Sequence, residues 1–403
     1  MRVSTNTVYE QGVTSILRQQ EGMLKTQQQV STGRRILTPA DDPVAAARAL
    51  DVTQAESVNT QYAENRNYAK SSLGLSESIL QGITTLIQDV RTVTVEAGNQ
   101  AFTDNDRAGL ATELRGRLDE LIGLANSADG AGEYLFSGYQ GRTKPFAQTA
   151  AGVQYSGDQG QRLIQAAASR QIAVSDSGTA VFERIKNGNG VFVTAAAAAN
   201  SGSGVINPGT VVTPASLTGH NYQVTFTVAA GATTYDVVDT TTATTLSTGN
   251  PYTSGNAITF DGLQFDIQGS PANGDRFTVA PSTNQSLFKT LSDLIVVVAA
   301  PVSGQTGGST RLSNGLNTAL LNLDHGLDNI LGIRAAVGTR LQELDALQSS
   351  GEDLALQYQQ TLSQLQDVDY AQALSELNRQ QVYLEAAQKS FMKISGLSLF
   401  EYV

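Results

Sequence analysis

Both ends of this 403-residue chain carry the same hydrophobic repeat, which limits the folds that the chain can adopt. Near the N-terminus, apolar or uncharged side chains recur at alternating steps of four and three residues, at Tyr9, Val13, Ile16, Gln20, Met23, Gln27 and Val30. The alternation returns near the C-terminus at Tyr370, Ala373, Leu377, Gln380, Leu384, Ala387, Phe391 and Ile394. This heptad spacing predicts coiled-coil helices. Because a helix cannot bury its own stripe, both ends must pack against other helices.

Glutamines occupy several positions in both stripes. A buried Gln side chain without a hydrogen-bond partner costs about 1–3 kcal/mol. The stripes therefore favour a particular partner geometry over maximal stability.

Long helices are also predicted between the two ends. Residues 43–98 read as one helix, which at ~1.5 Å per residue would run roughly 80 Å. A shorter helix follows Thr103 and Asp104, and a stripe along residues 316–344 predicts another. Helices of this length are typical of a rod.

Two segments have strand patterns instead. Within residues 133–175, "EYLFSGY" alternates like a strand, and "VQYSGDQGQRLIQ" predicts two short strands around a Gly-Asp-Gln-Gly turn. Residues 187–285 are rich in Gly, Thr, Val and Asn and contain several alternating runs between turn residues. These segments predict a small β excursion and a larger inserted β domain.

The expected fold is therefore mainly α with a β insertion: an elongated rod of long antiparallel helices with coiled-coil-like ends, plus an inserted all-β domain. We assign residues 1–40 and 360–403 to a terminal coiled-coil assembly domain. The helical rod domain comprises residues 41–180 and 286–359, with the β excursion at 133–175. The β-rich outer domain comprises residues 181–285.

The composition argues against several classes of partner and chemistry. A net charge of −11 disfavours nucleic acid and anionic membranes, because neutralising phosphates needs clustered Lys and Arg. The chain has no cysteine, which excludes disulfides and thiol chemistry. Its most apolar run, Leu294 to Ala300, is too short to cross a bilayer, and the N-terminus lacks the apolar core of a signal peptide. These signals alone would indicate a cytoplasmic protein without membrane insertion.

No motif in the sequence indicates catalysis. Asp324, His325 and Asp328 lie within one helical turn, but a second His or Cys ligand for a metal is missing. Ser286 and Lys289 match a Ser-x-x-Lys pattern, yet Ser286 is better interpreted as a helix N-cap. We predict no enzyme activity, no cofactor and no metal.

The segment "STGRRILTPADDP" predicts a corner between two helices. Gly33 should end the first helix in a left-handed conformation, and Asp41 or Asp42 should cap a second helix that begins at Pro43. Arg34 and Arg35 lie between these breaks. One hypothesis is that both arginines form ion pairs with a neighbouring subunit; the alternative is simple solvation, because exposed pairs contribute only ~0–1 kcal/mol.

The corner "STGRRILTPADDPVAAARAL" closely resembles a motif of the bacterial flagellin superfamily, and the C-terminal segment "DVDYAQALSELNRQQVYLEAAQKSFMKISGLSLFEYV" resembles its last helix. "EYLFSGYQGRTKPF" and the ending "SLFEYV" resemble the hook-associated protein 3 branch. The resemblance covers roughly residues 1–180 and 286–403, while the middle domain resembles no family that we can name.

This resemblance implies a structural protein at the hook-filament junction of the bacterial flagellum. It implies subunits that stack into a ring through their terminal helices. It also implies an extracellular protein exported unfolded without a cleaved signal peptide, which replaces the cytoplasmic assignment. The implied partners are the other hook-associated junction protein, flagellin and a flagellar export chaperone. Apolar surface near both ends and the two corner arginines form the expected assembly interface: Tyr9, Val13, Ile16, Met23, Val30, Arg34, Arg35, Leu377, Leu384, Phe391, Ile394 and Leu397.

Two alternatives remain open from the sequence. The chain could be a flagellin, the filament subunit of the same superfamily. Less readily, the β domain could be a carbohydrate-binding or adhesive module on a helical stalk. Its aromatics Tyr222, Tyr235, Tyr252, Phe260 and Phe265 fit strand packing better than sugar stacking.

Overall fold

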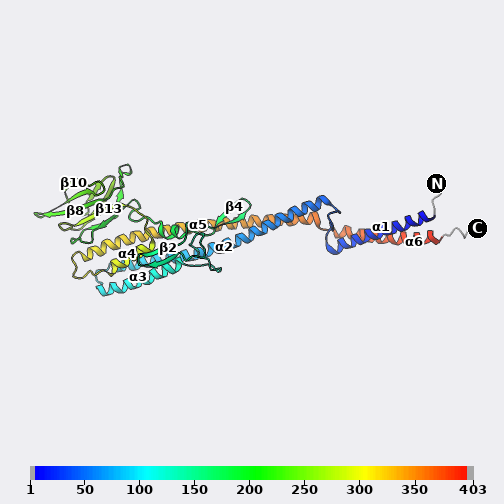
Figure 1. Ribbon diagram of the computed structural model, residues 1–403, viewed down its shortest axis with the longest axis horizontal. Helices are drawn as coiled ribbons and strands as arrows, with labels where there is room; N and C mark the ends of the chain where they lie inside the picture. The colour runs from blue at the N-terminus through cyan, green and yellow to red at the C-terminus, as the bar shows by residue number, and fades with distance from the viewer. Residues whose placement is uncertain (1–4, 397–403) are drawn as a thin grey trace, which may run out of the picture. The chain divides into compact units, whose positions relative to one another are not determined.

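The computed structural model describes the secondary structure of residues 5–396 and the side-chain burial of residues 7–393. Within this range the chain is mainly helical with an inserted β domain, as predicted (Figure 1). It separates into two compact units: unit 1 comprises residues 1–66 and 346–403, and unit 2 comprises residues 67–345. The described helices are α1 (Thr5–Thr32), α2 (Pro43–Ala97), α3 (Asp104–Ala125), α4 (Leu287–Ala299), α5 (Gly308–Gln366) and α6 (Tyr370–Gly396).

The predicted division at residues 40, 180, 286 and 360 is not tested by this separation and stays a prediction.

Local sequence signals set the helix starts in unit 2. Thr103 and Asp106 form a capping box at the start of α3, each side chain bonding the other's backbone N–H. Ser286 accepts a hydrogen bond from the Lys289 N–H at 3.1 Å, which confirms it as the N-cap of α4.

Heptad spacing builds the helical core of unit 2. On α5 the residues Leu316, Leu323, Ile330, Val337 and Leu344 follow at steps of seven, and all are buried. On α2 the buried stripe includes Leu73, Leu80, Ile83, Ile87 and Val90. The side chain of Arg334, which interrupts the α5 stripe, pairs with Glu77 at 2.7 Å. Each fully buried aliphatic side chain contributes about 1.5–3 kcal/mol.

The β excursion differs in part from the prediction. β1 (Phe146–Thr149) pairs with β2 (Gly152–Tyr155), and β3 (Leu163–Ala167) pairs with β4 (Arg170–Ala173). The two strands predicted within "VQYSGDQGQRLIQ" exist as β2 and β3, but they do not pair with each other. The strand predicted at "EYLFSGY" was wrong: this segment is a series of turns in which Gly138 has a φ of 72°. Its backbone bonds to nearby loops, for example from the Tyr134 N–H to the Gly141 carbonyl at 2.7 Å.

The inserted domain forms an antiparallel sheet in the order β10-β9-β8-β13-β5 and a smaller one built on β11-β12-β6, with β7 pairing β12. Its core includes Tyr222 and Phe265, and Tyr235, Tyr252 and Phe260 pack against that core. The interpretation of these aromatics as packing residues is thus confirmed. The strands are β5 (Phe192–Ala196), β6 (Val205–Ile206), β7 (Thr210–Val211), β8 (Tyr222–Ala229), β9 (Ala232–Asp239), β10 (Thr244–Pro251), β11 (Ala257–Phe260), β12 (Leu263–Gln268) and β13 (Arg276–Pro281).

Polar side chains of α5 bind the backbone of the inserted segment. Asn314 accepts from the Ile206 N–H at 3.0 Å, and Asn322 accepts from the Gly188 N–H at 3.2 Å. His325 Nε2 lies 2.8 Å from the Gly188 carbonyl oxygen. Asp324, its neighbour, pairs with Arg91 at 2.7 Å. The side chains of Asp324 and His325, which were considered as metal ligands, therefore connect α5 to other segments of unit 2.

Candidate assembly surface

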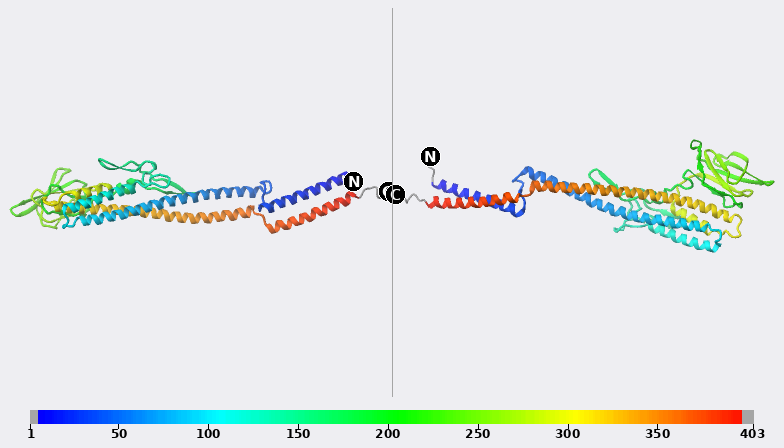
Figure 2. Two further views of the ribbon diagram at one scale, coloured as in Figure 1. Left: turned by 90° about the horizontal axis from the view of Figure 1, so that it is seen from below. Right: turned by 180° about the vertical axis from the view of Figure 1, so that it is seen from behind.

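In unit 1, α1 lies beside α6 in every view (Figures 1 and 2). The two predicted heptad stripes form the seam between these helices, and the rings of the stripe residues Tyr9 and Phe391 have centroids 5.0 Å apart. Gly12 allows this close approach, because a Cβ at Gly12 would lie 2.6 Å from the Phe391 ring. Of the residues predicted for the assembly interface, those that are half-buried here are Val13, Ile16, Met23, Val30, Leu377, Leu384 and Phe391.

Two predicted interface residues cannot be placed in this way. Ile394 lies within α6, but its side chain is outside the described residues. Leu397 lies outside the described residues altogether.

One glutamine in the seam lacks part of its hydrogen bonding. Gln380 Nε2 donates to Glu376 Oε1 at 3.1 Å, whereas Gln380 Oε1 is buried without a hydrogen-bond partner among the described residues. An unmet acceptor of this kind costs about 1–3 kcal/mol. The pairing of α1 with α6 is therefore less stable than the heptad pattern allows.

The corner at residue 33 has the predicted chemistry. Gly33 has a φ of 71°, and a Cβ there would lie 3.0 Å from the Tyr370 hydroxyl. The Gly33 carbonyl accepts from the Val368 N–H at 2.9 Å, and Arg34 forms a backbone bridge with Asp367. These bonds tie the turn after α1 to the turn before α6.

The two corner arginines differ in their surroundings. The Arg35 guanidinium donates to the Leu365 carbonyl at 2.9 Å and lies 3.4 Å from Asp42, so it has partners within its own chain. Arg34 is exposed, and its guanidinium has no ion pair within the described residues. The predicted ion pairs with a neighbouring subunit stay a prediction for both arginines.

Asp41 and Asp42 stabilise the start of α2. Asp41 accepts from Lys25 and from the Leu37 and Thr38 N–H groups, and the Lys25 ammonium above all lowers the pKa of Asp41 to about 2. Asp42 accepts from the Ala45 N–H at 3.0 Å, as an N-cap does, and this bond together with Arg35 lowers the pKa of Asp42. Both carboxylates are thus used to fix the corner.

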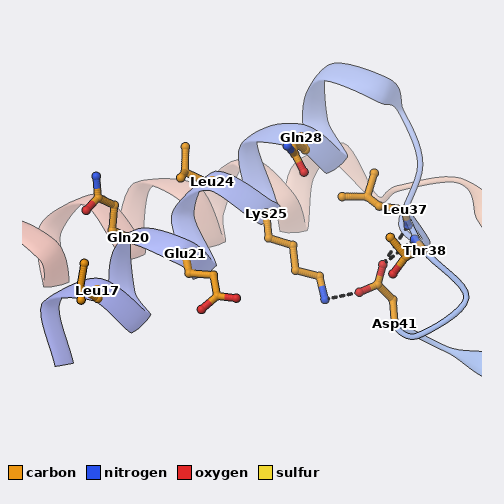
Figure 3. A pocket seen from close by; sticks show the side chains of 9 residues that line it. All are labelled: Leu17, Gln20, Glu21, Leu24, Lys25, Gln28, Leu37, Thr38 and Asp41. Carbon is orange, nitrogen blue, oxygen red and sulfur yellow. Dashed lines mark hydrogen bonds and ion pairs between the residues drawn. The ribbon is translucent and has the colours of Figure 1, made fainter. Parts of the chain in front are cut away.

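A hollow of about 450 Å³ lies between α1 and this corner (Figure 3). Leu17 and Leu24, one heptad apart and outside the seam to α6, line it, and Leu37 and Asp41 lie at its corner end. These two α1 leucines are 58% and 50% exposed. Apolar residues in a third heptad column beside the seam are typical of a helix that packs against more than one neighbour.

Unit 1 as a whole buries little apolar surface. Its buried hydrophobic residues, within the described range, are the small Ala45, Ala49 and Ala373. Its exposed large hydrophobics are Val8, Tyr9, Leu17, Leu24, Val44, Leu50, Val58, Leu354, Leu356, Tyr370, Leu374, Val382, Tyr383 and Met392. Of these, only Tyr9 belongs to the predicted assembly interface; the others, among them Val382 and Tyr383, were not predicted as site residues, and neither was the half-buried corner residue Leu37. Their positions follow from how α1 pairs with α6, which the heptad count alone does not fix.

Within residues 5–396 no helix is long and apolar enough to cross a membrane. The described residues also contain no group of three or more His, Asp or Glu side chains that could hold a metal ion.

Comparison with known proteins gives the class of this fold. The model of the bacterial flagellin N-terminal helical region matches residues 3–141. The D2-like domain of flagellar hook-associated protein 1 matches residues 195–281. The inserted domain, for which the sequence patterns indicated no family, therefore has a known relative. The chain is therefore a flagellin-like structural protein of the bacterial flagellum.

Full-length relatives are more specific. The flagellar hook-associated protein 3 of Salmonella typhimurium is 30% identical over 100% of this chain and 99% of its own length. The crystal structure of flagellar hook-associated protein 3 from Legionella pneumophila has a TM-score of 0.73 and 29% identity, covering 78% of this chain and 98% of its own. The flagellar junction protein FlgL of that organism has a TM-score of 0.70 at 29% identity, covering 79% and 100%.

This chain belongs to the flagellar hook-associated protein 3 family, the hook-filament junction proteins. The flagellin alternative is weaker: the flagellin of Listeria monocytogenes is 23% identical over 32% of this chain.

Proposed function

We propose that copies of this chain stack through α1 and α6 into a ring that joins the flagellar hook to the filament. The observation that supports this most directly is the composition of unit 1, whose described part buries only alanines among its hydrophobic residues and exposes large ones such as Leu17, Leu24 and Val382. An isolated chain gains little from holding such a surface in one conformation. Stacked copies would gain about 1.5–3 kcal/mol for each large side chain that they bury.

The hollow beside α1 is the proposed contact site for a helix of the neighbouring copy. Leu17 and Leu24 lie one turn on either side of Glu21, and the Lys25–Asp41 ion pair closes the corner end of the hollow. A neighbouring helix that covers both leucines would complete their apolar column. In this proposal the interface combines that column with the predicted seam residues from Tyr9 to Leu397.

Arg34 is the corner residue assigned to a neighbour. Because Arg35 already has partners within its chain, we assign to Arg34 the predicted ion pair with a carboxylate of the next subunit. An exposed pair of this kind fixes how two copies align and adds only ~0–1 kcal/mol.

The partners follow from the junction role. On the hook side the ring would contact the other hook-associated junction protein, and on the filament side it would contact flagellin. Before export, a flagellar chaperone would cover the exposed apolar residues of α6, which include Leu374, Tyr383 and Met392. The chain would leave the cell unfolded, without a cleaved signal peptide, and act outside the cell.

Gene deletion and complementation test the proposal. Cells without the gene should still build hooks but release flagellin monomers into the medium. The full chain should restore filament attachment, whereas chains lacking residues 1–40 or 365–403 should be made and yet fail to restore it. Attached filaments in cells carrying either truncated chain would refute assembly through the terminal helices.

A further inference from the structure

Unit 2 presents an exposed aromatic residue next to two exposed cations. Tyr139 is 67% exposed, and Arg142 and Lys144 follow it in the same loop, both exposed. Neither cation has an ion pair within the described residues. Tyr and Arg are enriched among residues that dominate protein interfaces.

The loop that carries Tyr139 is held rigidly. The Asp158 carboxylate accepts from the Tyr139 N–H at 3.0 Å and from the Gly160 N–H at 2.7 Å. Gly138 has a φ of 72°, and a Cβ there would collide with Asp158. A Cβ at Gly160 would collide with the Tyr139 ring, so the ring rests directly on backbone. An aromatic side chain fixed in this way loses little conformational entropy on binding.

Local charge makes this surface unusual for the chain. Residues 129–186 contain six Lys or Arg and five Asp or Glu, whereas the whole chain has 26 and 37. Several of the local carboxylates are already used: Glu133 pairs with Arg162, Asp176 pairs with Arg340, and backbone N–H groups lower the pKa of Asp158. Asp129 accepts from the Ala131 and Glu133 N–H groups, each at 2.9 Å. Glu183 precedes Arg184, which donates to Gln159 at 2.5 Å. The loop is therefore a cationic site on an acidic protein.

A second copy of this chain offers a complementary surface. Within unit 1, α2 residues 43–66 and α5 residues 346–366 are held together by a 2.8 Å bond from Asn59 to the Gly351 carbonyl. These two segments contain five carboxylates but only Arg48 and Arg66 as cations. Their exposed acidic residues are Asp51, Glu64, Glu352 and Asp353.

We propose that the loop of residues 139–144 binds the acidic α2–α5 surface of the next copy, with Tyr139 as anchor and Arg142 and Lys144 as counter-charges. Chains of net charge −11 repel one another, so a stacked assembly needs cations placed against carboxylates. The contact joins two different surfaces, and such a head-to-tail contact repeats from copy to copy as a ring requires. The inference rests on the proposed stacking and adds a contact outside the terminal helices.

Photo-crosslinking identifies the neighbour of Tyr139. The full chain with p-benzoylphenylalanine at position 139 is expressed in flagellated cells that lack the native gene, then irradiated. We expect a crosslink between two copies of this chain that falls within residues 43–66 or 346–366. A crosslink to flagellin or to another flagellar protein, or the absence of any crosslink between chains, would overturn the proposal.

Charge reversal tests the electrostatic pairing. Arg142→Glu with Lys144→Glu should reduce the number of attached filaments by about tenfold or more, as loss of dominant interface residues does. Adding Asp51→Lys and Asp353→Lys to the same chain reverses both surfaces and should restore attachment. The matched control is Arg115→Glu with Arg276→Glu, which removes two exposed cations of unit 2 elsewhere.

The outcomes separate the two proposals. If the loop variant assembles like its control while the terminal truncations fail, the loop contact is wrong and the terminal stacking stands. If the truncations assemble, the proposed function itself fails. Circular dichroism and limited proteolysis of the purified variants show whether they fold, and a second variant, Tyr139→Ala, changes no charge and should also reduce attachment.

Discussion

Gln380 shows how a single residue limits the stability of unit 1. Its Oε1 is buried without a partner among the described residues, although the residue occupies a seam position of α6. Gln380→Met removes the unmet acceptor and keeps a similar volume, so we expect the α1–α6 pair to gain about 1–3 kcal/mol. Protection of the Leu384 amide against hydrogen exchange measures the gain. The neighbouring Gln381→Met, at an exposed position, should change it little; equal protection in both variants would contradict this account.

Asp41 gives the corner a defined pH response. Lys25 and the Leu37 and Thr38 N–H groups stabilise its ionised form, so its folded-state pKa is about 2 instead of the usual 3.8. A lowered pKa means that the contribution of Asp41 to stability is full above pH 3.8 and is lost as the pH falls towards 2. NMR shifts of the Leu37 and Thr38 amides should titrate with a midpoint of about 2, and Asp41→Asn should abolish this transition. A midpoint at the usual carboxyl value would show that the ion pair is not formed.

The sequence predicted those residues whose role depends on near neighbours. The turn at Gly33, the cap at Ser286 and the start of α2 behind Asp42 could all be predicted, because each depends on backbone within a few residues. The close approach at Gly12 and the unmet acceptor of Gln380 could not, because both depend on which residues of the partner helix lie opposite.

At the scale of elements, α5 offers a direct test of heptad packing. Ile330 is fully buried, whereas the adjacent Leu331 is 42% exposed. Ile330→Ala should lower the free energy of unfolding of unit 2 by about 2–5 kcal/mol, because it removes methylene groups and leaves a cavity. Leu331→Ala is the matched control and should cost about 0.5 kcal/mol. Urea unfolding followed by circular dichroism measures both, and similar losses would show that α5 packs through another face.

Helices and strands differed in how well they could be predicted. A heptad pattern sustained over residues 316–344 leaves little choice of structure, and α5 contains that whole stretch. The seven residues of "EYLFSGY" alternate like a strand, yet a positive φ at Gly138 and hydrogen bonds to Ser127, Gly141 and Asp158 make them turns. A short alternating run does not reveal such hydrogen-bond partners in neighbouring loops.

At the scale of the whole molecule, the two units differ in the apolar surface that they bury. Unit 2 has a continuous helical stripe from Leu316 to Leu344 and a β-domain core around Phe226 and Phe277, whereas unit 1 buries only alanines within the described range. Local stability follows buried apolar contact, so the units should not share one unfolding free energy. Assembly can therefore change the stability of unit 1 while leaving unit 2 nearly as it is.

Hydrogen exchange measured by mass spectrometry tests this difference on the full chain. In the monomer, peptides from residues 5–32 and 370–393 should exchange at least about 100-fold faster than peptides from α3 or from residues 316–344, because only the latter would need unit 2 to open. In flagella isolated with the junction intact, the terminal peptides should become protected, since neighbouring copies would bury Leu17, Leu24 and Val382, which are 58%, 50% and 63% exposed in the single chain. Leu17→Ser with Leu24→Ser should reduce that new protection and leave unit 2 unchanged. If the monomer already protected its terminal peptides as strongly as α3, the terminal helices would be stable without burial by neighbouring copies. Stacking through α1 and α6 would then lose its driving force.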